Sequence, residues 1–259
     1  MKNPLPTAII AIFVSFSIFW TSSLLCAARG KESLDSFKAD AERALGIPVR
    51  IVETDQTGTA MGQTFCETQE VLIQIQPGLE TELHKQVLAH ELGHAILCAT
   101  GIRTYLKPTQ RGSALSATIL PLIAEIGSCY IDPLADAEAK RRGFSPDVAV
   151  SELVRRTKKH TPEEVHTFVA TFGDRAIDFS GVALYCTELR PHSFPMRDLS
   201  ETFSVEPRIN EKFQNLKKVL GMPGCSDATS CFLLTKHLRD TLSLQDLILI
   251  KNPQSGSYQ

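Results

Sequence analysis

Residues 81–99 read TELHKQVLAHELGHAILCA, and this stretch decides how the rest of the chain is interpreted. Its apolar residues recur at spacings of three and four, the period of a helix with one buried face. They are Leu83, Val87, Leu88, Leu92, Ala95 and Ile96. Gly101 stands where helices commonly end. We therefore expect a helix that begins at Thr81 and is closed by Gly101.

The centre of this helix carries His90-Glu91-Leu92-Gly93-His94. Helical residues four positions apart lie on one face, so the imidazoles of His90 and His94 can bind one metal ion. Glu91 is turned by about 100° from His90, which places its carboxylate beside the ion. The pattern predicts a metal that polarises a bound water and a base that takes the water's proton.

The strand expected just before this helix, residues 70–76, alternates apolar and polar side chains near its end and is stopped by Pro77-Gly78. With that strand, the motif resembles the zincin metallopeptidases, whose helix reads His-Glu-x-x-His and whose neighbouring strand borders the substrate cleft. The resemblance covers residues 71–99 strongly and extends weakly to 143. It implies an α+β fold, one catalytic Zn²⁺ and hydrolysis of peptide bonds, with Glu91 as general base and then proton donor to the leaving amine.

A catalytic zinc usually has three protein ligands, and the third must lie outside the motif. The metzincin extension would need glycine at Leu97 and histidine at Thr100, so that branch is excluded. The gluzincin-like branch takes a glutamate from a later helix, and Glu125 is the candidate. It is the sole acidic residue in the apolar stretch 122–127, and a carboxylate among such neighbours needs a partner. A metal and an arginine are the two alternatives.

Asp132, seven residues after Glu125, is expected on nearly the same face. It is a candidate to orient a ligand histidine from behind, or to cap the turn at Pro133. Asp136 and Glu138 are fallback ligands whose charged surroundings are typical of a solvent face. Zincin sites often use a further histidine or tyrosine to stabilise the oxyanion, and the sequence does not choose among the candidates: Tyr130, His160, His166, Tyr185 and His192.

The chain begins with Met1-Lys2, continues with an apolar run over residues 8–25 and then reaches small residues before Arg29. This order predicts a signal peptide over residues 1–28 and an exported protein, periplasmic or secreted. The alternative is an uncleaved anchor that leaves the protein attached to the membrane and facing outside. A membrane is expected as a partner only in that case.

Six cysteines follow the leader, an even number that is typical of disulfides in an oxidising compartment. Cys225 and Cys231 enclose five residues, which favours a local bridge. Cys98 extends the face of His90 and His94 by one turn, and Cys129 stands one turn from Glu125. We therefore consider a Cys98–Cys129 bridge between the two ligand helices.

Elsewhere the pattern predicts a zincin-like core over residues 29–143 and a mainly helical region over 144–251 that completes the same domain. A disordered tail is expected over 252–259. Within the core we expect a helix at 34–45, a strand at 49–52, a loop at 54–62 and a helix starting at Pro121. The later helices are expected at residues 146–159, from 161, 174–189, 206–220 and 230–242.

The composition is that of an ordinary globular protein, with 43% hydrophobic and 22% charged residues and a net charge of -2. The near-neutral charge argues against nucleic acid as a partner, because phosphate binding needs a dense basic surface. A peptide or protein substrate is expected. Two alternatives stay open: a non-catalytic binding protein on a zincin scaffold, and a zinc-dependent amidase acting on cell-wall material.

Overall fold

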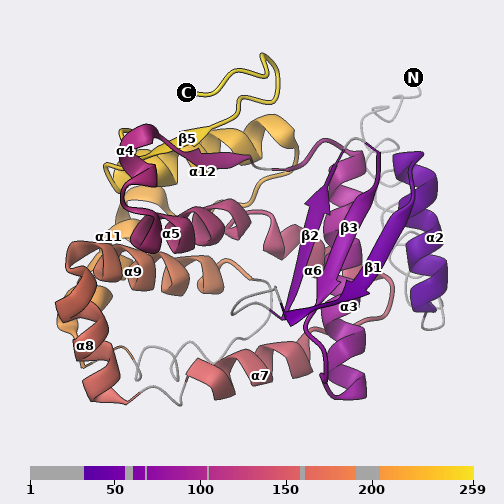
Figure 1. Cartoon of the computed structure of the whole chain (residues 1–259), viewed down its shortest axis with the longest axis horizontal. Helices are drawn as coiled ribbons and strands as arrows, with labels where there is room; N and C mark the ends of the chain where they lie inside the picture. The colour runs from indigo at the N-terminus through magenta and orange to yellow at the C-terminus, as the bar shows by residue number, and fades with distance from the viewer. Residues whose placement is uncertain are drawn as a thin grey trace, which may run out of the picture.

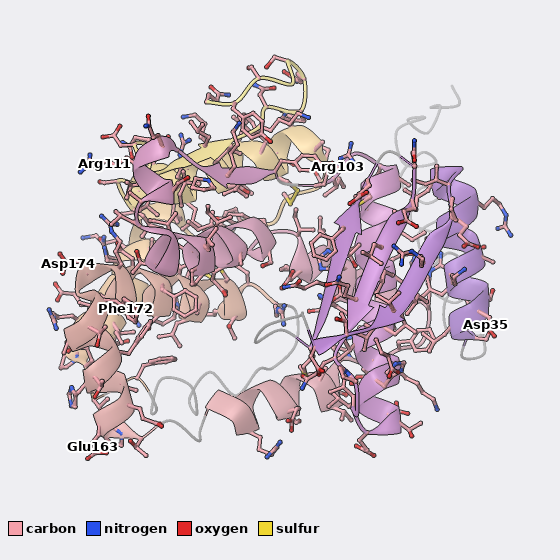
Figure 2. The ribbon with its side chains drawn as sticks, in the orientation of Figure 1. Asp35, Arg103, Arg111, Glu163, Phe172 and Asp174 are labelled. Carbon is pink, nitrogen blue, oxygen red and sulfur yellow. A yellow bond between two sulfur atoms is a disulfide. The ribbon has the colours of Figure 1, made fainter. Side chains whose placement is uncertain are left out.

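The computed structural model describes residues 32–55, 61–67, 69–103, 105–157, 161–190, 203 and 205–259. The expected leader over residues 1–28 lies outside these ranges. Within them the protein is a mixed α/β structure that is mostly helical (Figure 1). Exposed charged side chains of both signs, among them Asp35, Arg111 and Glu163, lie around its outside (Figure 2).

The strands are β1 (Val49–Glu53), β2 (Gly62–Cys66), β3 (Val71–Ile75), β4 (Leu106–Pro108) and β5 (Ile248–Ile250). The helices of the first half are α2 (Leu34–Leu45), α3 (Thr81–Ala99), α4 (Gln110–Ser113), α5 (Ser116–Ser128) and α6 (Asp132–Arg141). Those of the second half are α7 (Asp147–Thr157), α8 (Pro162–Phe172), α9 (Asp174–Glu188), α11 (Pro207–Leu220) and α12 (Ala228–Thr241).

The main sheet has the strand order β1-β3-β2, with β1 parallel and β2 antiparallel to β3. In β3 the side chains of Val71, Ile73 and Ile75 are fully buried and alternate with partly exposed neighbours, as the sequence pattern predicted. Strand β2 was not expected: its first residue, Gly62, was placed in a loop over residues 54–62, and no strand was predicted for residues 63–66. Pairing with β3 makes this segment one of the two edge strands of the sheet.

Two hydrophobic cores meet at α3 and α6. One core joins the sheet with α2 and includes Leu92 of α3 and Ala139 of α6. The other joins α5, α9, α11 and α12 and includes Leu97 of α3 and Ala135 of α6. Since each of the two helices contributes to both cores, their line of contact is fixed from both sides.

Gly93 allows these two helices to approach closely. A Cβ atom at Gly93 would lie 2.6 Å from the carbonyl oxygen of Ala135 and 3.0 Å from its Cα atom. Backbone atoms cannot move aside as the tip of a side chain can, so any side chain at this position would separate α3 from α6. The glycine of the motif therefore sets the position of α6.

The helix expected to begin at Pro121 begins earlier, at Ser116, and Pro121 lies inside α5. The lost hydrogen bond is tolerated because Ile119 and Leu122 on the same helix are fully buried. Residues 118–128 and 132–141 form a bent pair with an angle of 44°. Among the described residues no single helix meets the length and hydropathy of a membrane span, and this bent pair meets them only when its halves are taken together.

Arg142 links the end of α6 to α2. Its guanidinium, only 8% exposed, donates hydrogen bonds to Glu32 at 2.7 Å, Asp40 at 2.8 Å and Glu138 at 2.8 Å, and lies 4.3 Å from the centre of the Phe37 ring. The hydrogen bond from Arg142 holds the pKa of Asp40 below its usual value. Burial would raise the pKa of Glu138, but its arginine neighbours lower it.

The predicted disorder of residues 252–259 is wrong, because this segment folds back along β5. Ile250 and Gln259 exchange two backbone hydrogen bonds, and the guanidinium of Arg239 donates to the Gln259 carbonyl oxygen at 2.7 Å. Asn252 stabilises the turn by accepting from the backbone N–H groups of Gln254 and Ser255. The polar composition therefore reflects a turn with satisfied hydrogen bonds.

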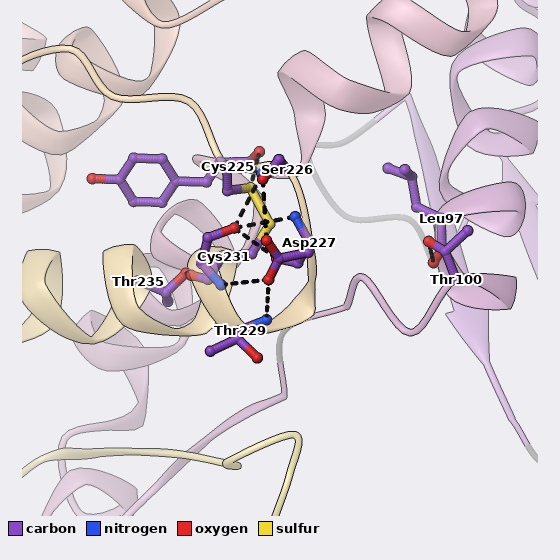
Figure 3. The surroundings of a disulfide bond; sticks show 10 residues. Leu97, Thr100, Cys225, Ser226, Asp227, Thr229, Cys231 and Thr235 are labelled. Atoms are coloured by element: carbon purple, nitrogen blue, oxygen red, sulfur yellow. Dashed lines mark hydrogen bonds between the residues drawn. A yellow bond between two sulfur atoms is a disulfide. The ribbon is translucent and has the colours of Figure 1, made fainter.

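Three disulfides are formed by the six cysteines. Cys225–Cys231 is confirmed and closes the loop before α12, where Asp227 accepts from the backbone of the first helical turn (Figure 3). The predicted Cys98–Cys129 bridge is wrong. Cys98 pairs with Cys66 and so joins α3 to β2, whereas Cys129 pairs with Cys186 on α9. The two cysteines face different neighbours, which their helical spacing could not show.

Candidate metal centre

His90 and His94 lie one turn apart on α3, and their Nε2 atoms are 3.0 Å from each other. Asp132, the first residue of α6, brings its Oδ1 atom to 3.3 Å from His94 Nε2 and 4.0 Å from His90 Nε2. The three side chains are 18–19% exposed, so solvent reaches them. Together they form a group that could hold a metal ion.

The donor set fits zinc. Ligand atoms about 2.1 Å from a tetrahedral zinc lie roughly 3.4 Å apart, and the three separations here bracket that value. Two imidazoles and one carboxylate are also ligand types that zinc accepts, and three protein ligands leave a fourth position for water.

Asp136 holds the ring of His90 from behind. Its Oδ1 atom lies 2.7 Å from His90 Nδ1, which leaves Nε2 directed at the group. A hydrogen bond of this kind fixes the tautomer and orientation of a ligand histidine. From its position in the sequence, Asp132 was expected in this role, and Asp136 was expected as a fallback ligand. In the structure Asp136, one turn after Asp132 on α6, contacts His90, and Asp132 belongs to the group that could hold a metal.

Charged neighbours shift the pKa values of His90 and Asp132 in opposite directions. Burial alone would lower the pKa of His90, but the hydrogen bond to Asp136 and the nearby carboxylates raise it to about 9. Burial likewise opposes ionisation of Asp132, yet Arg190 and the two histidines hold its pKa far below the usual range. The carboxylate that would meet a cation is therefore ionised at neutral pH.

Arg190 is the residue that sequence reasoning missed. It follows α9, donates a hydrogen bond from Nη2 to Asp132 Oδ2, and places Nε 3.7 Å from Asp136 Oδ2. No hydrogen bond from the described residues reaches Asp136 Oδ2. The only signal in the sequence was the expectation that a buried acid needs an arginine or a metal.

Glu125, the expected third ligand, is not part of the group formed by His90, His94 and Asp132. Burial and the charge of Asp132 raise its pKa to about 7, while Arg190 acts in the opposite direction. The chain bends between α5 and α6, so a residue after the bend reaches the histidines and Glu125 does not. In the group that could hold a metal, the acidic member is Asp132, and a ligand role for Glu125 stays a prediction.

Glu91 lies beside the group and against the edge strand. Its carboxylate is buried, and Oε2 accepts a hydrogen bond of 2.6 Å from the Thr64 hydroxyl of β2. A Cβ atom at Gly62 would lie 2.8 Å from both Cγ and Oε1 of Glu91. Strand β2 therefore approaches Glu91 closely and presents a hydroxyl donor to it.

The candidates for oxyanion stabilisation lie as follows. Tyr130 and Tyr185 are buried and their hydroxyls lie 3.2 Å apart, with Tyr185 also donating to the Gly221 carbonyl. His166 is exposed on α8, and His160 and His192 lie outside the described residues.

No protein-family model, curated protein or solved structure matches this chain.

Proposed function

We propose that the protein is an exported zinc-dependent peptidase. The observation that carries the proposal is the convergence of His90 and His94 with Asp132, at separations that suit zinc, beside the carboxylate of Glu91. Metal binding alone does not require Glu91, whereas hydrolysis by a metal-bound water requires a base in that place.

His90, His94 and Asp132 would hold the zinc. When bound, zinc polarises the substrate carbonyl and lowers the pKa of its water. Asp136 keeps His90 in the tautomer whose Nε2 is free to bind. Glu91 takes the proton of the water and transfers it to the departing amine, and the Thr64 hydroxyl keeps its carboxylate in position.

The edge strand supports a peptide as substrate. Strand β2 pairs on one side with β3, and within the described residues its other side pairs with no strand of the sheet. An extended peptide can add to such an edge through main-chain hydrogen bonds. The same strand contacts Glu91 through Thr64, so a peptide bound there would run close to the base. This observation favours a peptidase over a cell-wall amidase.

The disulfides support export. All three bridges join cysteines of the described residues, and such bridges persist in oxidising compartments. We infer a periplasmic or secreted location, with the leader over residues 1–28 as the export signal.

The test is to measure zinc per chain and cleavage of a broad set of quenched peptides in parallel. Glu91→Gln should keep zinc and lose cleavage, and Asp132→Ala should lose both. Glu125→Gln, which changes the ligand expected from sequence, should keep both. A wild-type protein without zinc would contradict the proposal, and cleavage unaffected by Glu91→Gln would contradict the mechanism. If the protein binds zinc and cleaves peptidoglycan but none of the peptides, the amidase is favoured.

A further inference from the structure

Arg190 contacts both acidic residues of the site from one side. Asp132 and Asp136 stand one turn apart at the start of α6, and the guanidinium reaches an oxygen of each. The other oxygen of each carboxylate faces the histidines: Asp136 Oδ1 contacts His90, and Asp132 Oδ1 approaches both rings. Each carboxylate therefore has one oxygen toward Arg190 and one toward the metal group.

This division restricts how Asp132 can bind a metal. A carboxylate can bind a cation through one oxygen or through both. Because Asp132 Oδ2 is hydrogen-bonded to Arg190, only Oδ1 is presented to His90 and His94. A rotation that offered both oxygens would break the contact with Arg190. Binding through one oxygen leaves room at zinc for the water that hydrolysis needs.

We propose that Arg190 is a positioning residue that holds Asp132 as a one-oxygen ligand. The inference rests on the proposed zinc site and extends it to a residue outside the helix that carries the motif. Arginine suits the role because its planar fork can donate to two acceptors at once, which the single ammonium of lysine does less well.

The sign of the effect on metal affinity separates this role from simple electrostatics. A cation near a metal site repels the metal, so removal of Arg190 would tighten binding if charge were its main effect. If Arg190 positions Asp132, its removal weakens binding, by about 10–100-fold as for other residues that orient metal ligands.

Arg175 provides a matched control on α9. It donates to Asp178, a buried carboxylate that also contacts Lys212 and lies outside the metal group. Arg175→Gln removes an arginine from a buried carboxylate, as Arg190→Gln does. A general loss of packing would affect both variants, whereas a positioning role affects only one.

The experiment titrates the metal-free full chain with Co²⁺ and Zn²⁺, following cobalt absorption and zinc affinity by chelator competition. Wild type and Arg175→Gln should give the same intense spectrum and affinity. Arg190→Gln should bind zinc about 10–100-fold more weakly. Its cobalt spectrum should be less intense, because Asp132 would bind through both oxygens. Arg190→Lys should restore part of the zinc affinity. Unchanged or tighter binding by Arg190→Gln, with wild type binding normally, would overturn this inference alone. A wild type that binds neither metal would overturn the proposed function as well.

Discussion

Replacement of Gly93 by alanine tests whether the close approach of α3 and α6 builds the metal site. The added Cβ atom would lie 2.6 Å from the Ala135 carbonyl oxygen, where ordinary contact begins at 3.4 Å. The helices must therefore separate by about 0.8 Å at this point. Zinc–ligand distances tolerate a change of only about 0.2 Å. Since Asp132 is on α6 and the two histidines are on α3, zinc affinity should fall at least about tenfold.

The stability of the metal-free protein should change much less. Overpacking costs about 1–3 kcal/mol, and alanine in place of glycine inside a helix recovers about 1 kcal/mol. The midpoint of thermal unfolding should therefore fall by less than about 8 °C. This separation of a large effect on zinc from a small effect on stability is what the geometry predicts.

Gly127→Ala is the control, because a Cβ atom there meets only the end of the Leu106 side chain, at 3.3 Å. Zinc affinity is measured by chelator competition and stability by thermal unfolding without metal. Gly93→Ala with the zinc affinity of wild type would refute the reasoning that Gly93 places Asp132. Equal losses in both variants would show that the effect is not specific to the contact between α3 and α6.

Thr64→Val removes the hydroxyl that donates to Glu91, so kcat/KM should fall about tenfold at unchanged zinc content. Thr64→Ser should keep most of the wild-type kcat/KM. Equal activity in all three proteins would contradict the role of β2. Arg142→Met removes one arginine from each of Glu32, Asp40 and Glu138, although Asp40 keeps Arg43 and Glu138 keeps Arg141, and should cost about 2 kcal/mol at neutral pH. The pKa values of Asp40 and Glu138 are lowered in the folded protein, so their ionised forms contribute stability above the ordinary carboxyl pKa of about 4. In denaturant unfolding, the difference in unfolding free energy between wild type and variant should therefore shrink as the pH falls below about 4. Replacing Cys66 and Cys98 together by alanine should lower the unfolding free energy by about 3–4 kcal/mol, since the bridge spans 32 residues; a loss below about 1 kcal/mol would argue against the pairing.

Local sequence patterns predicted helix α3 and the site residues that it carries. The spacing of apolar residues gave α2 its observed bounds and placed His90, Glu91 and His94 on α3 as the structure has them. These features depend on neighbours within a few residues along the chain. A helix that carries His90 and His94 brings them together whatever surrounds it.

The rest of the site depends on contacts between distant segments. A bend of the chain after Ser128 lies between Glu125 and Asp132, which joins the histidines, and Arg190 comes from the segment that follows α9. Strand β2 was missed because its pairing with β3, rather than its composition, makes it a strand. The partner of Cys98 was missed for the same reason.

The crossing of α3 and α6 also suggests how distant relatives could be found. His90 and His94 are four positions apart, as are Asp132 and Asp136, and each acid contacts a histidine across the glycine contact. The signature of this site is thus a two-part pattern: His-Glu-x-Gly-His, followed later by Asp-x-x-x-Asp. We expect a search for the paired pattern to detect chains that overall sequence similarity overlooks.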